Sequence, residues 1–182
     1  MQISQMVNIS EVLIREIEKK EFVVLEDLLY EAIFQPDMMN PIPRSVIDIP
    51  EVRVYIKDFS QKKDDYCLVA LSNGQIIGGV WVRILADDIK GFGNIDDKTP
   101  EFVISVFKKF QNQGVGKLLM TEMISYLRKN GYSQVSLSVQ KENYAVKMYK
   151  NFGFGIVSRN NEDYIMLLNL VDEMNHSTKL IC

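Results

Sequence analysis

A glycine-rich turn between an apolar strand and a long helix constrains this chain more than any other feature. Residues 102–107 are predicted to form the strand, Gly114 and Gly116 lie in the turn, and a helical pattern begins at Val115. Such a turn exposes backbone N–H groups at the positive end of a helix dipole, and glycine lets an anion approach them closely. The sequence therefore predicts a site for a phosphorylated ligand.

Two common nucleotide motifs do not fit this turn. A P-loop requires glycine where Gln111 stands and serine or threonine where Leu118 stands. A dinucleotide motif requires a third glycine at the position of Leu119. The remaining pattern is Q-x-x-G-x-G, which runs from Gln111 to Gly116. In its strand-turn-helix setting it resembles the pyrophosphate-binding motif of the GNAT superfamily of acyl-CoA-dependent N-acyltransferases.

A second pattern downstream supports the same resemblance. Alternating apolar residues predict a strand, and a short helix follows with apolar residues at helical spacing. Gly153 ends that helix as a C-cap, and another strand begins at Phe154. The run from Asn143 through Ala145 and Tyr149 to Gly153-Phe154 resembles the second GNAT signature, N-x-x-A-x-x-x-Y-x-x-x-G-F, with one residue fewer after the asparagine.

The remaining patterns predict one mixed domain. Residues 12–170 are expected to form it, after an N-terminal extension at 1–11 and before a C-terminal tail at 171–182. Strands are predicted at 12–17, 66–71, 75–84, 102–107, 133–139, 154–157 and 164–170, and helices at 21–34, 51–59, 115–130 and 143–152. The resemblance implies an α/β (α+β) fold, a mixed central sheet with a splayed strand pair and helices on both faces.

Composition predicts a soluble globular protein. The chain has 182 residues, of which 47% are apolar and 25% charged, and a net charge of −3 gives no reason to expect a nucleic-acid partner. It contains no apolar run long enough to cross a membrane and no N-terminal secretory signal. Cys67 and Cys182 have no zinc or disulfide spacing, and His176 is the only histidine. A cytoplasmic protein without a metal is therefore expected.

The resemblance implies where acetyl-CoA, as the co-substrate, would bind. Its pantetheine arm would lie in the gap between the splayed strands, and the backbone amides of residues 113–117 would hold the pyrophosphate. Asn143 would contact the arm or cap its own helix, and these two roles are compatible. The implied binding residues are Val106, Phe107, Gln111, Asn112, Gln113, Gly114, Val115, Gly116, Lys117 and Asn143.

Two residues are candidates for acid-base catalysis. Tyr149 resembles the family's general acid, which protonates the departing CoA thiolate, and a buried core aromatic is the alternative interpretation. Glu101 stands where several family members have a general base that often acts through water. A solvated acid at the start of a strand is the alternative interpretation of Glu101.

The implied function is an N-acetyltransferase that moves an acetyl group from acetyl-CoA to a primary amine by direct attack in a ternary complex. The acceptor could be a small molecule or a protein amine, and a homodimer is possible because such folds often dimerise. A non-catalytic acyl-CoA-binding or sensing module on the same fold is the alternative. A third interpretation is a structural phosphate-binding domain, which would show no preference for CoA over other phosphorylated molecules.

Overall fold

The protein forms one sheet of seven strands in the order β1-β2-β3-β4-β5-β7-β6. The computed structural model describes residues 6–37 and 39–171. The start of the predicted extension, and the predicted tail beyond 171 with His176 and Cys182, lie outside these residues. The strands are β1 (Leu13–Glu16), β2 (Tyr66–Ser72), β3 (Gln75–Arg83), β4 (Glu101–Val106), β5 (Gln134–Gln140), β6 (Gly155–Arg159) and β7 (Asp163–Asn169).

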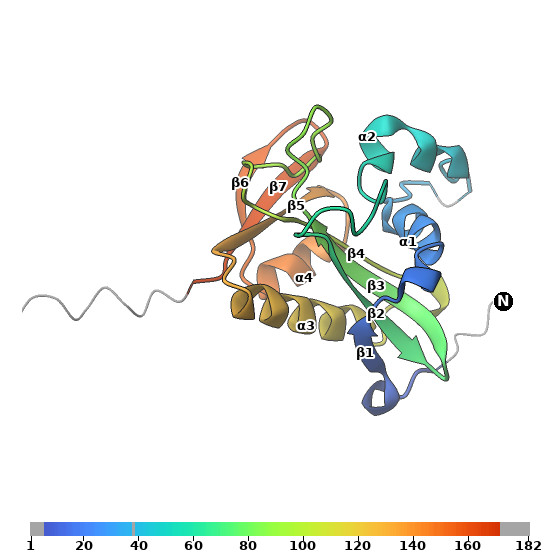
Figure 1. Ribbon diagram of the computed structural model, residues 1–182. Coiled ribbons are helices and arrows are strands. Elements are labelled where there is room, and N and C mark those ends of the chain that lie inside the picture. The colour runs from blue at the N-terminus through green and yellow to red at the C-terminus, as the bar shows by residue number, and fades with distance from the viewer. Residues whose placement is uncertain (1–5, 38, 172–182) are drawn as a thin grey trace, which may run out of the picture.

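Helices cover both faces of this sheet (Figure 1). Helices α1 (Val24–Ala32) and α2 (Pro50–Arg53) lie on one face, and α3 (Val115–Lys129) and α4 (Ala145–Asn151) lie on the other. Because successive strand residues point to opposite faces, Leu68 packs into the core beneath α3 while Val69 packs into the core beneath α1. The predicted fold class, with helices on both faces of a mixed sheet, is confirmed.

The first two helices are shorter than predicted. Residues 19–21 form a separate 3₁₀ turn, so α1 begins only at Val24. Helix α2 ends at Arg53, although the apolar pattern extends to residue 59. The Arg83 side chain on β3 donates hydrogen bonds to the carbonyls of Val54 and Lys57, and Asp58 adopts a left-handed backbone. These contacts draw the segment after α2 against the sheet as turns, which hydrophobic periodicity does not reveal.

The sheet is interrupted between β4 and β5. These two parallel strands share a single paired position, Glu101 with Ser136. In contrast, β4 pairs with β3 along its whole length, and β5 pairs with β7 over seven positions. The two central strands therefore separate after Glu101 and leave a gap along the second half of β4. This gap confirms the predicted splayed strand pair.

Candidate active site

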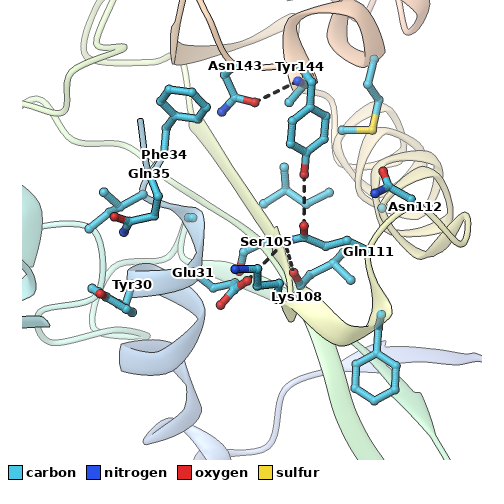
Figure 2. Close-up of a pocket in the computed structure, with 18 of the residues that line it drawn as sticks. Tyr30, Glu31, Phe34, Gln35, Ser105, Lys108, Gln111, Asn112, Asn143 and Tyr144 are labelled. Carbon is cyan, nitrogen blue, oxygen red and sulfur yellow. Dashed lines mark hydrogen bonds between the residues drawn. The ribbon is translucent and has the colours of Figure 1, made fainter. Parts of the chain in front are cut away.

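A cavity of about 490 Å³ lies at the gap between the splayed strands. Figure 2 shows its walls: the end of α1 and the segment after it, the end of β4, the glycine turn, and the start of α4. This volume lies within the range typical of ligand pockets. The gap in the sheet therefore opens into a ligand-sized cavity that is lined by residues of these four segments.

The glycine turn leaves the N-terminus of α3 open toward this cavity. Gly114 precedes the helix with φ of 90°, a left-handed conformation that favours glycine. The first helical hydrogen bond runs from the Leu118 N–H to the Gly114 carbonyl at 3.2 Å. The N–H groups of residues 115–117 precede that bond and have no acceptor within the helix. Together with the helix dipole they form an anion site beside a cavity lined by Lys117.

Gly116 keeps this anion site open. A Cβ added there would lie 3.8 Å from the Met148 sulfur and 3.8 Å from Val106 Cγ2, which is ordinary contact. The backbone of Gly116 is not left-handed, so helix geometry alone does not require glycine. All three residues line the cavity. The missing side chain therefore widens the cavity where a phosphate would approach the helix.

The free edge of β4 is suited to an extended ligand that carries amide groups. The Phe107 N–H donates to the Ile77 carbonyl on β3 at 3.0 Å. Since alternate residues of an antiparallel strand turn their backbone groups toward the partner strand, those of Ile104 and Val106 face the gap. Both residues line the cavity. The chain therefore fits the pantetheine arm and pyrophosphate of an acyl-CoA, with a strand edge for one and a helix terminus for the other.

Gln111, the first residue of the glycine motif, ties three walls of the cavity together (Figure 2). Its side-chain amide donates to the Val106 carbonyl at 2.8 Å and to the Glu31 carboxylate at 3.2 Å. The Tyr144 hydroxyl donates to the Gln111 side-chain oxygen at 3.5 Å. Burial raises the pKa of Glu31 above its ordinary value. This side chain thus fixes the turn relative to β4, α1 and the entry to α4.

Asn143 and Tyr149 both line the cavity. The Asn143 side-chain oxygen accepts a hydrogen bond from the Ala145 N–H at 2.9 Å, so it also caps α4. Tyr149 is buried, and its ring meets Phe154 edge-on at 5.9 Å. Burial raises the pKa of the Tyr149 hydroxyl above its ordinary value, so the group keeps its proton at neutral pH.

Glu101 does not line this cavity. It lies at the start of β4, three residues before Ile104, which is about 10 Å along a strand. Its Oε1 accepts hydrogen bonds from the Tyr55 hydroxyl and, at 2.8 Å, from the Gly93 N–H. Its Oε2 is buried and has no hydrogen-bond partner within the described chain. Burial raises the pKa of Glu101 to about 7, while its two hydrogen-bond donors act in the opposite direction.

The side chains of three other predicted binding residues point elsewhere. Phe107 packs between the two hydrophobic cores, and Val115 is buried in the core beneath α3. The Gln113 side chain accepts a hydrogen bond from the Val7 N–H at 2.7 Å and donates to the Lys109 carbonyl at 3.2 Å. Gln113 and Val115 can therefore contribute only backbone groups to an anion site. The remaining predicted binding residues, Val106, Gln111, Asn112, Gly114, Gly116, Lys117 and Asn143, line the cavity.

Sequence reasoning missed Glu31 and Tyr144 as lining residues. Tyr144 directly follows the predicted binding residue Asn143 inside the second motif, so its position in the sequence indicates a place at the same site. Glu31 meets Gln111 across 80 residues of sequence. No local pattern in the sequence carries that contact.

Comparison with known proteins gives the class of this protein. Residues 29–154 match the model of the acetyltransferase (GNAT) family. The chain is 28% identical over 162 residues to acetyltransferase PseH of Campylobacter jejuni, covering 86% of this chain and 96% of PseH. It is 29% identical over 86 residues to mycothiol acetyltransferase of Propionibacterium freudenreichii, covering 47% of this chain. That match covers 26% of the relative, so this chain spans about a quarter of its length.

A solved structure shares the fold of this chain. The structure of yncA from Salmonella typhimurium with its cofactor acetyl-CoA superimposes with a TM-score of 0.65 at 16% identity, covering 88% of this chain and 95% of that chain. In the present structure the sheet opens beside the N-terminus of α3, and a cavity lies between the edge of β4 and that terminus. The chain belongs to the acetyltransferase (GNAT) family. No helix in the described part of the chain is long and apolar enough to cross a membrane.

Proposed function

We propose that this protein transfers an acetyl group from acetyl-CoA to a primary amine by direct attack in a ternary complex. The observation that carries the proposal is one continuous cavity that reaches from the open N-terminus of α3, along the free edge of β4, to Tyr149. A site for a phosphate alone would not need a strand edge. Family membership and the solved neighbour that contains acetyl-CoA support the same ligand.

The chain holds acetyl-CoA through groups of two kinds. The N–H groups of residues 114–117 and the Lys117 ammonium group bind the pyrophosphate. The backbone groups of Ile104 and Val106 pair with the pantetheine arm, as a neighbouring strand would. Gln111 keeps these two sites in register because it bonds to the Val106 carbonyl from within the turn. When bound, acetyl-CoA supplies a thioester, which is an acyl group with a good leaving group.

Tyr149 donates the proton that the departing sulfur requires. It comes from α4, on the opposite side of the gap from β4, and lines the cavity. Burial favours the protonated phenol, so the hydroxyl keeps its proton until a thiolate develops beside it. The phenol then protonates the thiolate, and solvent restores the phenol. A general acid of this kind contributes about 10²- to 10⁴-fold to a rate.

Glu101 accepts the proton that the acceptor ammonium must lose before attack. Its pKa of about 7 allows it to take up a proton near neutral pH. Glu101 does not line the cavity, so in this mechanism ordered water must relay the proton over about 10 Å along β4 to the carboxylate. The acceptor approaches from the segment after α1, where Phe34, Gln35 and Pro41 line the cavity. Acceptors of this class include small-molecule and protein amines.

The test is turnover of acetyl-CoA with a panel of primary amines, followed by release of free thiol and by the mass of the product. Acetylated product is expected from the wild type, with a rate at least tenfold lower in Tyr149→Phe. Tyr126→Phe is the matched control, because Tyr126 stacks on Tyr66 and does not line the cavity. Full turnover in Tyr149→Phe would contradict the acid role. Tight binding of acetyl-CoA without any product across the panel would favour a non-catalytic acyl-CoA-binding module.

A further inference from the structure

Glu101 has one oxygen held in place and the other left free. The Tyr55 hydroxyl and the Gly93 N–H both donate to Oε1, whereas Oε2 has no partner within the described chain. Glu101 is 3% exposed and Oε2 itself is buried, so bulk solvent does not supply the missing hydrogen bond to Oε2. A buried carboxylate gains most when both oxygens are bonded. Because only Oε1 has hydrogen-bond donors, Oε2 is the oxygen at which Glu101 can take up a proton.

The Tyr55 hydroxyl has a fixed direction. The Phe92 N–H donates to its oxygen at 2.7 Å, so the hydroxyl proton is directed to Glu101. The ring is stacked against Phe92, with centroids 6.1 Å apart and planes at 24°. The hydroxyl thus acts as acceptor for the 84–100 loop and as donor to the first residue of β4.

Two side chains of β3 fix the backbone on which Tyr55 is carried. The Trp81 ring N–H donates to the Tyr55 carbonyl at 3.1 Å, and Arg83 donates to the Val54 carbonyl at 2.8 Å. Arg83 also makes a two-contact ion pair with buried Asp65, at 2.8 and 3.0 Å. Because β4 pairs with β3 along the whole length of β4, Tyr55 and Glu101 are both fixed to the same two strands.

We propose that Tyr55 is a positioning residue for Glu101. Its hydroxyl holds Oε1 of Glu101, so that Oε2 is the oxygen that receives the proton of the acceptor amine. The inference rests on the proposed function, in which Glu101 is the base. The N–H bond of the ammonium breaks as a relaying water takes up its proton, that water releases a proton from one of its O–H bonds, and a new O–H bond forms at Oε2. The carboxylate becomes a neutral acid while Oε1 keeps its two hydrogen bonds.

The other groups around Glu101 leave this assignment intact. Its cross-strand neighbour on β3 is Arg83, whose charge is committed to Asp65. Its partner on β5 is Ser136, which is uncharged. On the loop side Oε2 lies beneath Gly91, where an added Cβ would come within 1.9 Å of it. Tyr55 is therefore the titratable side chain that bonds to Glu101, and removal of its hydroxyl removes that bond and the acceptor of the Phe92 N–H.

The first experiment measures the titration of Glu101 directly. The protein is labelled with ¹³C at glutamate carboxyls, and the Glu101 resonance is assigned by its loss in Glu101→Gln. A hydrogen bond to a charged group favours the carboxylate, so Tyr55→Phe is expected to raise the pKa of Glu101 by about one to two units. Tyr132→Phe is the matched control, because its hydroxyl donates to Asp64 at 2.7 Å and does not contact Glu101. An unchanged titration in Tyr55→Phe would overturn the inference.

The second measurement is the pH dependence of kcat/KM with an amine that the wild type accepts. Tyr55→Phe is expected to move the acidic limb of the profile to higher pH, by the same amount as the pKa of Glu101 rises. Tyr132→Phe is expected to leave the acidic limb at its wild-type pH. A lower rate in Tyr55→Phe with an unmoved limb would indicate a merely structural hydroxyl and overturn the inference, while the base role of Glu101 stands. A wild-type limb in Glu101→Gln would remove Glu101 as the base, and the inference with it. The side chains of Tyr55→Phe and Glu101→Gln are similar in shape to those they replace. The unfolding midpoints of these two variants are measured in parallel.

Discussion

The burial of Glu101 predicts a specific dependence of stability on pH. Its pKa is about 7 in the folded protein, against an ordinary value of 4.5. The folded state therefore binds this proton more tightly than the unfolded state does. Stability from this group is fully present below pH 4.5 and is lost as the pH rises to 7. A difference of 2.5 pH units at 1.36 kcal/mol each corresponds to about 3 kcal/mol, a large part of the 5–15 kcal/mol typical of a domain.

The assay is urea unfolding of the wild type and of Glu101→Gln between pH 4 and pH 8. Glutamine has the same shape and does not titrate, so the free energy of unfolding of the variant should lack this loss. The difference between variant and wild type is therefore expected to rise by about 3 kcal/mol across the range. Carboxylates with lowered pKa values, such as Asp96 and Glu21, occur in both proteins and cancel. A difference that stays flat would refute the reasoning that Glu101 is buried without a full set of partners.

Three further perturbations follow from the same contacts. Gly91→Ala should lower the free energy of unfolding by about 1–3 kcal/mol, because its Cβ would overlap Glu101 Oε2 and crowd Leu85; urea unfolding measures this. Asp65→Asn should cost about 3–5 kcal/mol in the same assay, since it leaves the buried charge of Arg83 unpaired. Lys117→Met should weaken acetyl-CoA binding and reduce its dependence on salt concentration, as calorimetric titrations at two ionic strengths would show.

Each of these predictions has a control within the chain. Gly155→Ala should be close to neutral, because no atom lies within 4 Å of its added Cβ. Asp87→Asn removes an exposed ion pair with Lys62 and should cost less than about 1 kcal/mol. Equal losses at buried and exposed sites would contradict the burial argument. A salt dependence unchanged in Lys117→Met would place the bound phosphates away from this lysine.

Much of the fold could be predicted from short-range patterns. The strand-turn-helix unit around Gly114 and the motif from Asn143 to Phe154 depend on local spacing, and the structure places them on the two sides of one cavity. Glycine position, apolar period and order along the chain are physical constraints that act over a few residues. They were sufficient for the order of the helices and strands. The splayed strands were implied by the resemblance to the GNAT family, as were the predicted site residues, which make up eight of the 22 residues that line the cavity.

What could not be predicted depends on contacts between distant segments. Helix α2 ends early because Arg83, some 30 residues later, bonds to the carbonyls of the segment that follows it. Glu31 meets Gln111, and Tyr55 meets Glu101, across 80 and 46 residues. Periodicity shows which face of a strand Glu101 occupies, but not that a loop covers it. The cover separates the predicted base from the cavity, a feature that only the tertiary structure contains.

The central claim is that the gap between β4 and β5 is an acetyl-CoA site, and calorimetric titration of acetyl-CoA into the wild type and Gly116→Ala tests it most directly. The Cβ of the variant has room in the protein itself, and alanine is favoured over glycine in a helix by about 0.5–1 kcal/mol. We therefore predict an unfolding midpoint at or above that of the wild type together with acetyl-CoA affinity at least tenfold weaker, with ATP as the reference ligand. Equal acetyl-CoA affinity in the two proteins, or no preference over ATP in the wild type, would contradict the account.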